Sequence, residues 1–131
     1  MRLHLEVLTI QGTVVDEEVD EVIVPLVDGW KGVLPGHLAF IARVMRGTIT
    51  MRTGDRERIA ATLGGTLTVE PARVTLLTGA AMLDRELADL EREISAELES
   101  IAAIEAEAEK HFDRVYQHMA ETFKRGARRL S

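Results

Sequence analysis

Two residues in the N-terminal half, Asp28 and His37, flank one loop and could together do hydrolytic chemistry. A carboxylate that orients an imidazole makes the ring a general base, which could activate water. The chain lacks the motifs that accompany such chemistry: it has no P-loop, no dinucleotide fingerprint and no G-x-S-x-G nucleophile elbow. Loop residues of these types are more often structural or interfacial. A small hydrolase that uses His37 therefore remains an alternative, and we predict no catalytic residue.

Metal and thiol chemistry have little support in the sequence. The chain has no cysteine, which excludes disulfides, thiol catalysis and zinc–thiolate sites and fits a reducing compartment. His111 and His118 could share a helix face, but no third ligand has matching spacing. The acidic stretch Asp16–Glu21 is interrupted by Val19, which is typical of a strand edge and not of a calcium loop. We predict no metal and no cofactor.

The bulk composition indicates a soluble globular chain. It has 131 residues, 46% of them hydrophobic and 29% charged, which fits one domain or a small domain with an appendage. No apolar run approaches the roughly 20 residues that span a bilayer, and the start has no signal-peptide pattern. The net charge of −6 argues against nucleic acid as a partner, because phosphate binding needs a basic face.

Up to Gly79 the sequence has the pattern of short strands separated by turns. Apolar and polar residues partly alternate, and glycine or proline follows most segments. The stretch "RTGDRER" (Arg52–Arg58) between two strand patterns has the pattern of a hairpin, with Gly54 and Asp55 as turn residues. We expect an antiparallel β-sandwich or flattened barrel of about ten short strands. The clearest segments are Leu3–Ile10, Val19–Leu26, Gly47–Arg52, Glu57–Leu63, Thr66–Glu70 and Arg73–Thr78.

From Ala80 to Arg125 the pattern is helical, because glycine and proline are absent and apolar residues recur every three or four positions. A helix of this length either folds back as a hairpin, with Ser100–Ala103 as the best turn, or remains one long helix against a partner. The overall fold class is therefore α+β. The apolar stripe comprises Leu83, Leu87, Leu90, Ile94, Leu98, Ile101, Ile104, Ala108, Phe112, Val115 and Met119.

Charge is segregated along the helical part. Residues 82–109 have a net charge of −8, and residues 110–131 have a net charge of +4. Such charges can simply solvate the helix and suit its C-terminus. They could also pair the two halves of a hairpin, or the basic residues could meet an acidic partner. Those basic residues are Lys124, Arg125, Arg128 and Arg129.

The stretch Gly32–His37, "GVLPGH", has the signature of a type II turn. Pro35 presets φ at the first central position, and Gly36 can take the positive φ of the second. His37 follows and could bond the loop backbone. Just upstream, the only tryptophan, Trp30, sits in a glycine-flanked loop. It could fold back as a lid or project as a contact.

The residues from Val19 to Arg52, with Gly32, Leu34, Pro35, Gly36 and His37 in register, strongly resemble the epsilon subunit of the bacterial F-type ATP synthase. The opening strands and "IAATLGGTLTVEPARVTLLTG" (Ile59–Gly79) extend the resemblance over Leu3–Gly79. It implies a β-sandwich followed by a helical C-terminal region. It divides the chain into a sandwich domain, residues 1–80, and a helical domain, residues 81–131.

The resemblance implies a coupling subunit without a reaction of its own. In the family the sandwich binds the gamma subunit and rests on the c-ring, so ion-driven rotation reaches the alpha/beta catalytic head. The loop that faces the ring corresponds here to Asp28, Gly29, Trp30 and Lys31, and the Gly32–His37 turn would fix its shape. The implied location is peripheral, on the cytoplasmic face of the bacterial inner membrane.

In many relatives the C-terminal region is a helical hairpin that can inhibit ATP hydrolysis, and its basic residues meet the catalytic head. Lys124, Arg125, Arg128 and Arg129 suit that role. Some relatives also bind ATP through an I/L-D-x-x-R-A motif. Leu83, Asp84 and Ala88 fit this motif, but Leu87 replaces the arginine. Without that cation we do not expect nucleotide binding. A generic interaction module with a coiled-coil arm is the other alternative.

Overall fold

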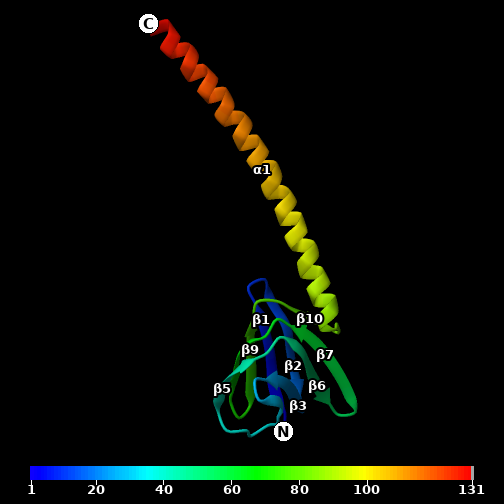
Figure 1. Cartoon of the computed structure of the whole chain (residues 1–131). Coiled ribbons are helices and arrows are strands. Elements are labelled where there is room, and N and C mark those ends of the chain that lie inside the picture. Colours follow the sequence, from blue (N-terminus) through cyan, green and yellow to red (C-terminus); the bar gives the residue numbers. More distant parts are fainter. Residues whose placement is uncertain (131) are drawn as a thin grey trace. The chain divides into compact units, whose positions relative to one another are not determined.

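The computed structural model describes the backbone of residues 1–130 and the side chains of residues 1–122 (Figure 1). Ten strands precede one helix. The strands are β1 (Leu3–Thr9), β2 (Gly12–Val19), β3 (Glu21–Leu26), β4 (Gly29–Val33), β5 (Phe40–Val44), β6 (Gly47–Thr53), β7 (Arg56–Thr62), β8 (Gly65–Val69), β9 (Arg73–Thr78) and β10 (Ala81–Leu83). The helix is α1 (Leu87–Leu130).

The strands form one sheet in the order β10-β7-β6-β3-β5-β8-β9-β1-β2, and β4 pairs with β3 outside this path. All pairs are antiparallel except β1–β9, which is parallel. The sheet curls into a nearly closed sandwich, as the sequence predicted. Its interior consists of the alternating inward residues of most strands, such as Leu3, Leu5 and Val7 on β1, all fully buried.

Four of the strands, β2, β4, β5 and β10, were not among the predicted segments. β4, β5 and β10 are short, and β4 contains glycines that argue against a strand in isolation. The predicted strand Val19–Leu26 was wrong at its start: the chain bends at Asp20 between β2 and β3. The Asp20 carboxylate there accepts the Gly54 amide at 2.6 Å, which ties the bend to the β6–β7 hairpin.

The C-terminal element is a single helix of 44 residues, so the hairpin alternative was wrong and the single long helix is confirmed. Nothing in Ser100–Ala103 breaks a helix. The helix begins at Leu87 and not near Ala80, because residues 81–83 form β10 and Asp84 adopts a positive φ of 59°. Leu83 therefore belongs to a strand and not to the helical stripe. None of the described helix is apolar over a length that would cross a bilayer.

The chain forms two compact units, of which the first is Met1–Arg92 and the second begins at Glu93. The first unit includes the opening turn of α1, where Leu90 is only 2% exposed. Asp89 caps this end, since its carboxylate accepts the Glu86 amide at 3.2 Å. Beyond it the stripe residues Leu98, Ile101, Ile104, Phe112, Val115 and Met119 are exposed.

Candidate interaction surface at the β3–β4 hairpin

The four predicted contact residues form the tip of a β-hairpin. β3 and β4 pair antiparallel from Val22↔Val33 to Leu26↔Gly29. Asp28 lies in the connecting turn, while Gly29, Trp30 and Lys31 begin β4. The expectation of a loop was wrong for these three residues, because pairing with β3 overrides the low strand propensity of the glycines.

Trp30 projects from the hairpin. Its side chain is 67% exposed, and that of neighbouring Val27 is 77% exposed. The lid interpretation of Trp30 was therefore wrong for this chain. An exposed tryptophan beside an exposed valine is a typical feature of a contact surface, because both bury large apolar area when a partner covers them.

The predicted type II turn after β4 is confirmed. The His37 amide donates to the Leu34 carbonyl at 3.3 Å, and Gly36 has a φ of 80°. The Gly36 amide donates to the Pro71 carbonyl at 2.7 Å, which anchors the turn to the β8–β9 connection. The predicted backbone contact of the histidine is present, since His37 Nδ1 lies 2.8 Å from the Leu38 carbonyl oxygen.

Phe40 links this turn to the hairpin tip. Its ring meets the His37 ring edge-to-face, with centroids 5.1 Å apart. The Lys31 ammonium lies 5.1 Å from the centroid of the same ring, which is a cation–π distance. The turn thus positions Lys31 through one aromatic side chain. Phe40 was not predicted as a site residue, because β5, the strand that it begins, was not predicted either.

A groove runs between the hairpin tip and β5. Arg43 on β5 joins the predicted tip residues there, although it is twelve residues from Lys31 in sequence. The residues that line the groove are Leu26, Val27, Asp28, Gly29, Trp30, Lys31, Phe40, Ala42 and Arg43.

The hydrolytic pair considered for this region does not form. Among the described residues, Asp28 and His37 share no hydrogen bond or ion pair, and His37 is engaged with Leu38 and Phe40. An imidazole held in this way stabilises the turn and has no carboxylate to orient it as a base.

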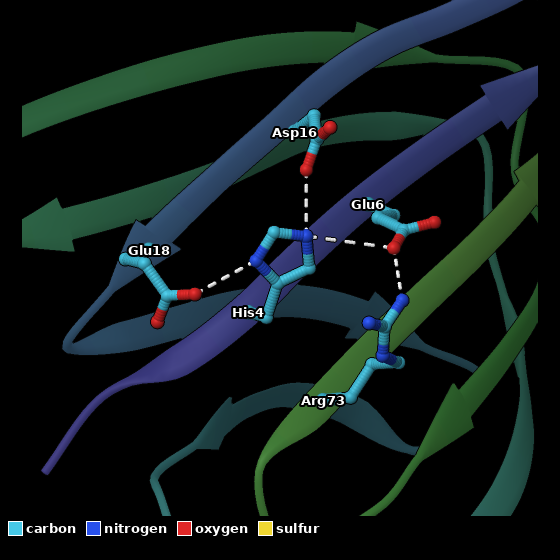
Figure 2. A network of polar contacts seen from close by, with 5 residues as sticks. All are labelled: His4, Glu6, Asp16, Glu18 and Arg73. Atoms are coloured by element: carbon cyan, nitrogen blue, oxygen red, sulfur yellow. Dashed lines mark hydrogen bonds and ion pairs between the residues drawn. The ribbon is translucent and has the colours of Figure 1, made fainter.

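A second polar cluster lies on the outer side of β1, β2 and β9, shown in Figure 2. His4 Nε2 lies 2.6 Å from Asp16 and 3.4 Å from Glu6, and His4 Nδ1 lies 2.8 Å from Glu18. Arg73 pairs with the same Glu6 carboxylate. The hydrogen bond with Glu18 is the largest cause of a raised pKa for His4, and Asp16 raises it further. The sequence did not reveal this cluster, because it depends on strand register.

His4, Glu6 and Asp16 are the one group among residues 1–122 whose ligand atoms could converge on a metal ion, since those atoms lie within 4.8 Å of one another. The same oxygens already hold His4 and Arg73. With His4 protonated, three carboxylates face two cations, so the cluster is best described as an ion-pair network that joins three strands.

The residues of the incomplete nucleotide motif have structural roles. The Asp84 carboxylate accepts two hydrogen bonds from Arg58, at 2.8 and 3.2 Å, and Arg58 also donates to Glu17 at 2.6 Å. These hydrogen bonds with Arg58 are the main cause of a lowered pKa for Asp84. Leu87 begins α1. The side chains of the predicted basic contacts Lys124, Arg125, Arg128 and Arg129 lie outside the described residues.

The fold is a β-sandwich domain with a helical extension. A family model described as "ATP synthase, Delta/Epsilon chain, beta-sandwich domain" matches residues 2–84. An ATP synthase epsilon chain of Halalkalibacterium halodurans is 37% identical over 94 residues, 72% of this chain and 70% of that one. One from Synechococcus sp. (strain CC9311) is 33% identical over 109 residues, 82% and 81% of the two chains. This chain belongs to the ATP synthase delta/epsilon chain family.

Solved structures show the same fold at low identity. A chain of the Euglena gracilis mitochondrial ATP synthase, in a structure of its OSCP/F1/c-ring, aligns with a TM-score of 0.60 at 18% identity and covers 72% of this chain and 62% of that one. A chain of the Tetrahymena thermophila mitochondrial ATP synthase central stalk/c-ring aligns with a TM-score of 0.54 at 8% identity, covering 63% and 66%.

Proposed function

We propose that this chain is a central-stalk subunit that couples ion-driven rotation of the c-ring, through the gamma subunit, to ATP synthesis in the alpha/beta catalytic head. Membership in the delta/epsilon family supports this role. The two structural relatives come from ATP synthase assemblies that include a c-ring. The chain contributes no chemistry of its own in this account. It is a peripheral protein on the cytoplasmic face of the bacterial inner membrane.

The hairpin tip Asp28, Gly29, Trp30 and Lys31 is the proposed contact with the c-ring. The observation on which this rests is the 67% exposure of Trp30 on a well-paired hairpin. A rigid hairpin loses little entropy when it docks, so its apolar tip can transmit torque without first becoming ordered. Gly32, Leu34, Pro35, Gly36 and His37 hold the tip in place through Phe40.

The proposed domains are a sandwich that binds the stalk and the ring, residues 1–80, and a helical arm, residues 81–131. The exposed stripe from Leu98 to Met119 and the basic end suit an arm that binds the catalytic head and inhibits ATP hydrolysis. For experiments we place the cut after Arg92, because β10 and the opening turn of α1 belong to the sandwich unit.

The test uses an epsilon-free catalytic head, with its gamma subunit, from the same organism. Full-length chain and a variant that ends at Arg92 are added, and binding and ATP hydrolysis are measured. We expect both to bind and only the full chain to slow hydrolysis. If both bind and neither slows it, the arm does not inhibit. If neither binds, the proposed stalk function is wrong.

A further inference from the structure

Two cations in the hairpin groove, Lys31 and Arg43, have no ion-pair partner among the described residues. Of the nine arginines in residues 1–92, six form ion pairs with carboxylates. Within the described part of the chain, Lys31 and Arg43 form none, although both line one groove. Asp28 lines it as well, without pairing with either, so the groove has an excess of one positive charge.

Exposed apolar side chains line part of the groove beside these cations. Val27 and Trp30 in its lining are 77% and 67% exposed, and Ile41, the neighbour of the lining residues Phe40 and Ala42 on β5, is 73% exposed. Lys31 is held over the Phe40 ring and is thereby partly preorganised. Cations with an apolar rim recognise a carboxylate well, because a docked partner excludes water from the new ion pair.

We propose that Lys31 and Arg43 bind an acidic side chain on the c-ring loop that meets the hairpin tip. This inference rests on the proposed function, since it names the chemistry of the partner at the same site. It makes Arg43, which lies outside the tip itself, a determinant of partner specificity.

A protein carboxylate fits this groove better than an anionic lipid surface. Binding to anionic membranes typically uses clusters of about four to eight cations, and this groove has two beside Asp28. The whole chain has a net charge of −6, which a negatively charged membrane repels. One acidic side chain is enough to balance the excess charge of the groove.

The test measures association of the full chain with c-ring purified from the same organism in neutral detergent, at about 0.05 M and 0.5 M salt. Arg43→Glu should slow association by about tenfold and weaken its salt dependence, and Arg43→Gln should slow it less. Asp28→Asn should speed association, because it removes a carboxylate that repels the incoming one. Arg56→Glu, an equal charge change on β7, is the matched control and should change little. Circular dichroism verifies that each variant is folded.

The possible outcomes distinguish the proposed contact of the hairpin tip with the c-ring from the proposed binding of an acidic side chain by Lys31 and Arg43. If Trp30→Ala weakens binding but Arg43→Glu does not, the tip docks and the carboxylate inference is overturned. If neither substitution matters while the wild type binds, the tip is not the contact and the proposed site fails. Binding of the wild type to vesicles of phosphatidylglycerol, lost in Arg43→Glu, would also overturn the inference in favour of a lipid headgroup. Slower association for Arg43→Glu together with faster association for Asp28→Asn supports it.

Discussion

The backbone at Gly64 comes so close to a neighbouring segment that no side chain fits there. A Cβ at this position would lie 2.4 Å from the carbonyl oxygen of Val44, and Gly64 has a φ of 78°. Gly54 in the β6–β7 hairpin has a similar φ of 60° but open space around it. A side chain at Gly54 would therefore meet only the strain of a positive φ, whereas a side chain at Gly64 would meet the same strain and a clash with neighbouring backbone atoms.

We predict that Gly64→Ala destabilises the protein by about 3 kcal/mol or more, since strain and a backbone clash add. Gly54→Ala should cost only about 1 kcal/mol, the price of the left-handed conformation alone. Urea denaturation of both variants measures the difference. Equal losses would mean that the β7–β8 connection relaxes away from Val44.

The raised pKa of His4 predicts a stability that depends on pH. Protonated His4 bonds Glu18 and Asp16, so the folded protein holds this proton more tightly than the unfolded chain, whose histidine has a pKa of 6.5. The contribution is complete below pH 6.5 and is lost as pH rises through the higher folded pKa. The melting temperature should therefore fall over this range.

Thermal melts of the wild type and His4→Gln between about pH 6 and pH 9 test this. The melting temperature of His4→Gln should lack the part of the fall that His4 causes. At the high end of the pH range it should approach the melting temperature of the wild type. His118→Gln, on the exposed helix, is the control and should follow the wild-type profile. Parallel profiles for wild type and His4→Gln would show that the network does not stabilise the fold.

Local chemistry explains which residues the sequence could predict. Pro35 and Gly36 favour a type II turn through their own backbone preferences, so the turn and the bond of His37 to the backbone were predicted correctly. Arg43 and Phe40 reach the site only because β5 returns beside the hairpin, and sequence spacing does not encode that. The same holds for the His4 network, which depends on the register between β1 and β2.

Among the elements, Arg58 on β7 joins the two ends of the sheet. Its guanidinium bonds Glu17 on the edge strand β2 and Asp84 just after the other edge strand, β10. Edge strands otherwise leave backbone groups without partners and invite pairing with other chains. Arg58 thus helps to close the sandwich.

Arg58→Met should therefore lower the melting temperature and speed amide hydrogen exchange selectively in β2 and β10. Arg56→Met on the same strand, which removes a cation that forms no ion pair among the described residues, should do neither. Hydrogen exchange followed by mass spectrometry gives the local readout. Uniform acceleration in all strands would contradict a specific role at the edges.

The opening turn of α1 is part of the sandwich unit, and the rest of the helix is not. We predict that Leu90→Ala costs about 2–3 kcal/mol, because a buried leucine leaves a cavity. Leu98→Ala, 60% exposed on the same helix, should cost less than about 0.5 kcal/mol. Chemical denaturation of the two variants checks the contrast, and equal costs would mean that the helix is stabilised as one unit.

For the C-terminal region, the sequence pattern predicted a helix but did not determine its full structure. Its existence followed from composition and periodicity, but its start at Leu87 and the choice between a hairpin and one helix did not. The strand β10 was hidden inside the same helical pattern, since Ala81, Met82 and Leu83 are good helix formers. Pairing with β7 decides their conformation.

At the scale of the whole molecule, a β-sandwich presents an exposed hairpin tip, and the chain continues into a long amphipathic helix. The core of the sandwich is independent of the tip, since Trp30 and Val27 are outside it. Changes at the tip should therefore alter coupling without altering the fold.

The most direct test of the central claim is ATP synthesis driven by an ion gradient in vesicles that contain epsilon-depleted ATP synthase from the same organism. Added wild-type chain should restore synthesis. Trp30→Ala, with unchanged melting temperature, should restore it at least about twofold less well, because an exposed tryptophan is a typical binding hot spot. Failure of the wild type to bind or to restore synthesis would contradict the account.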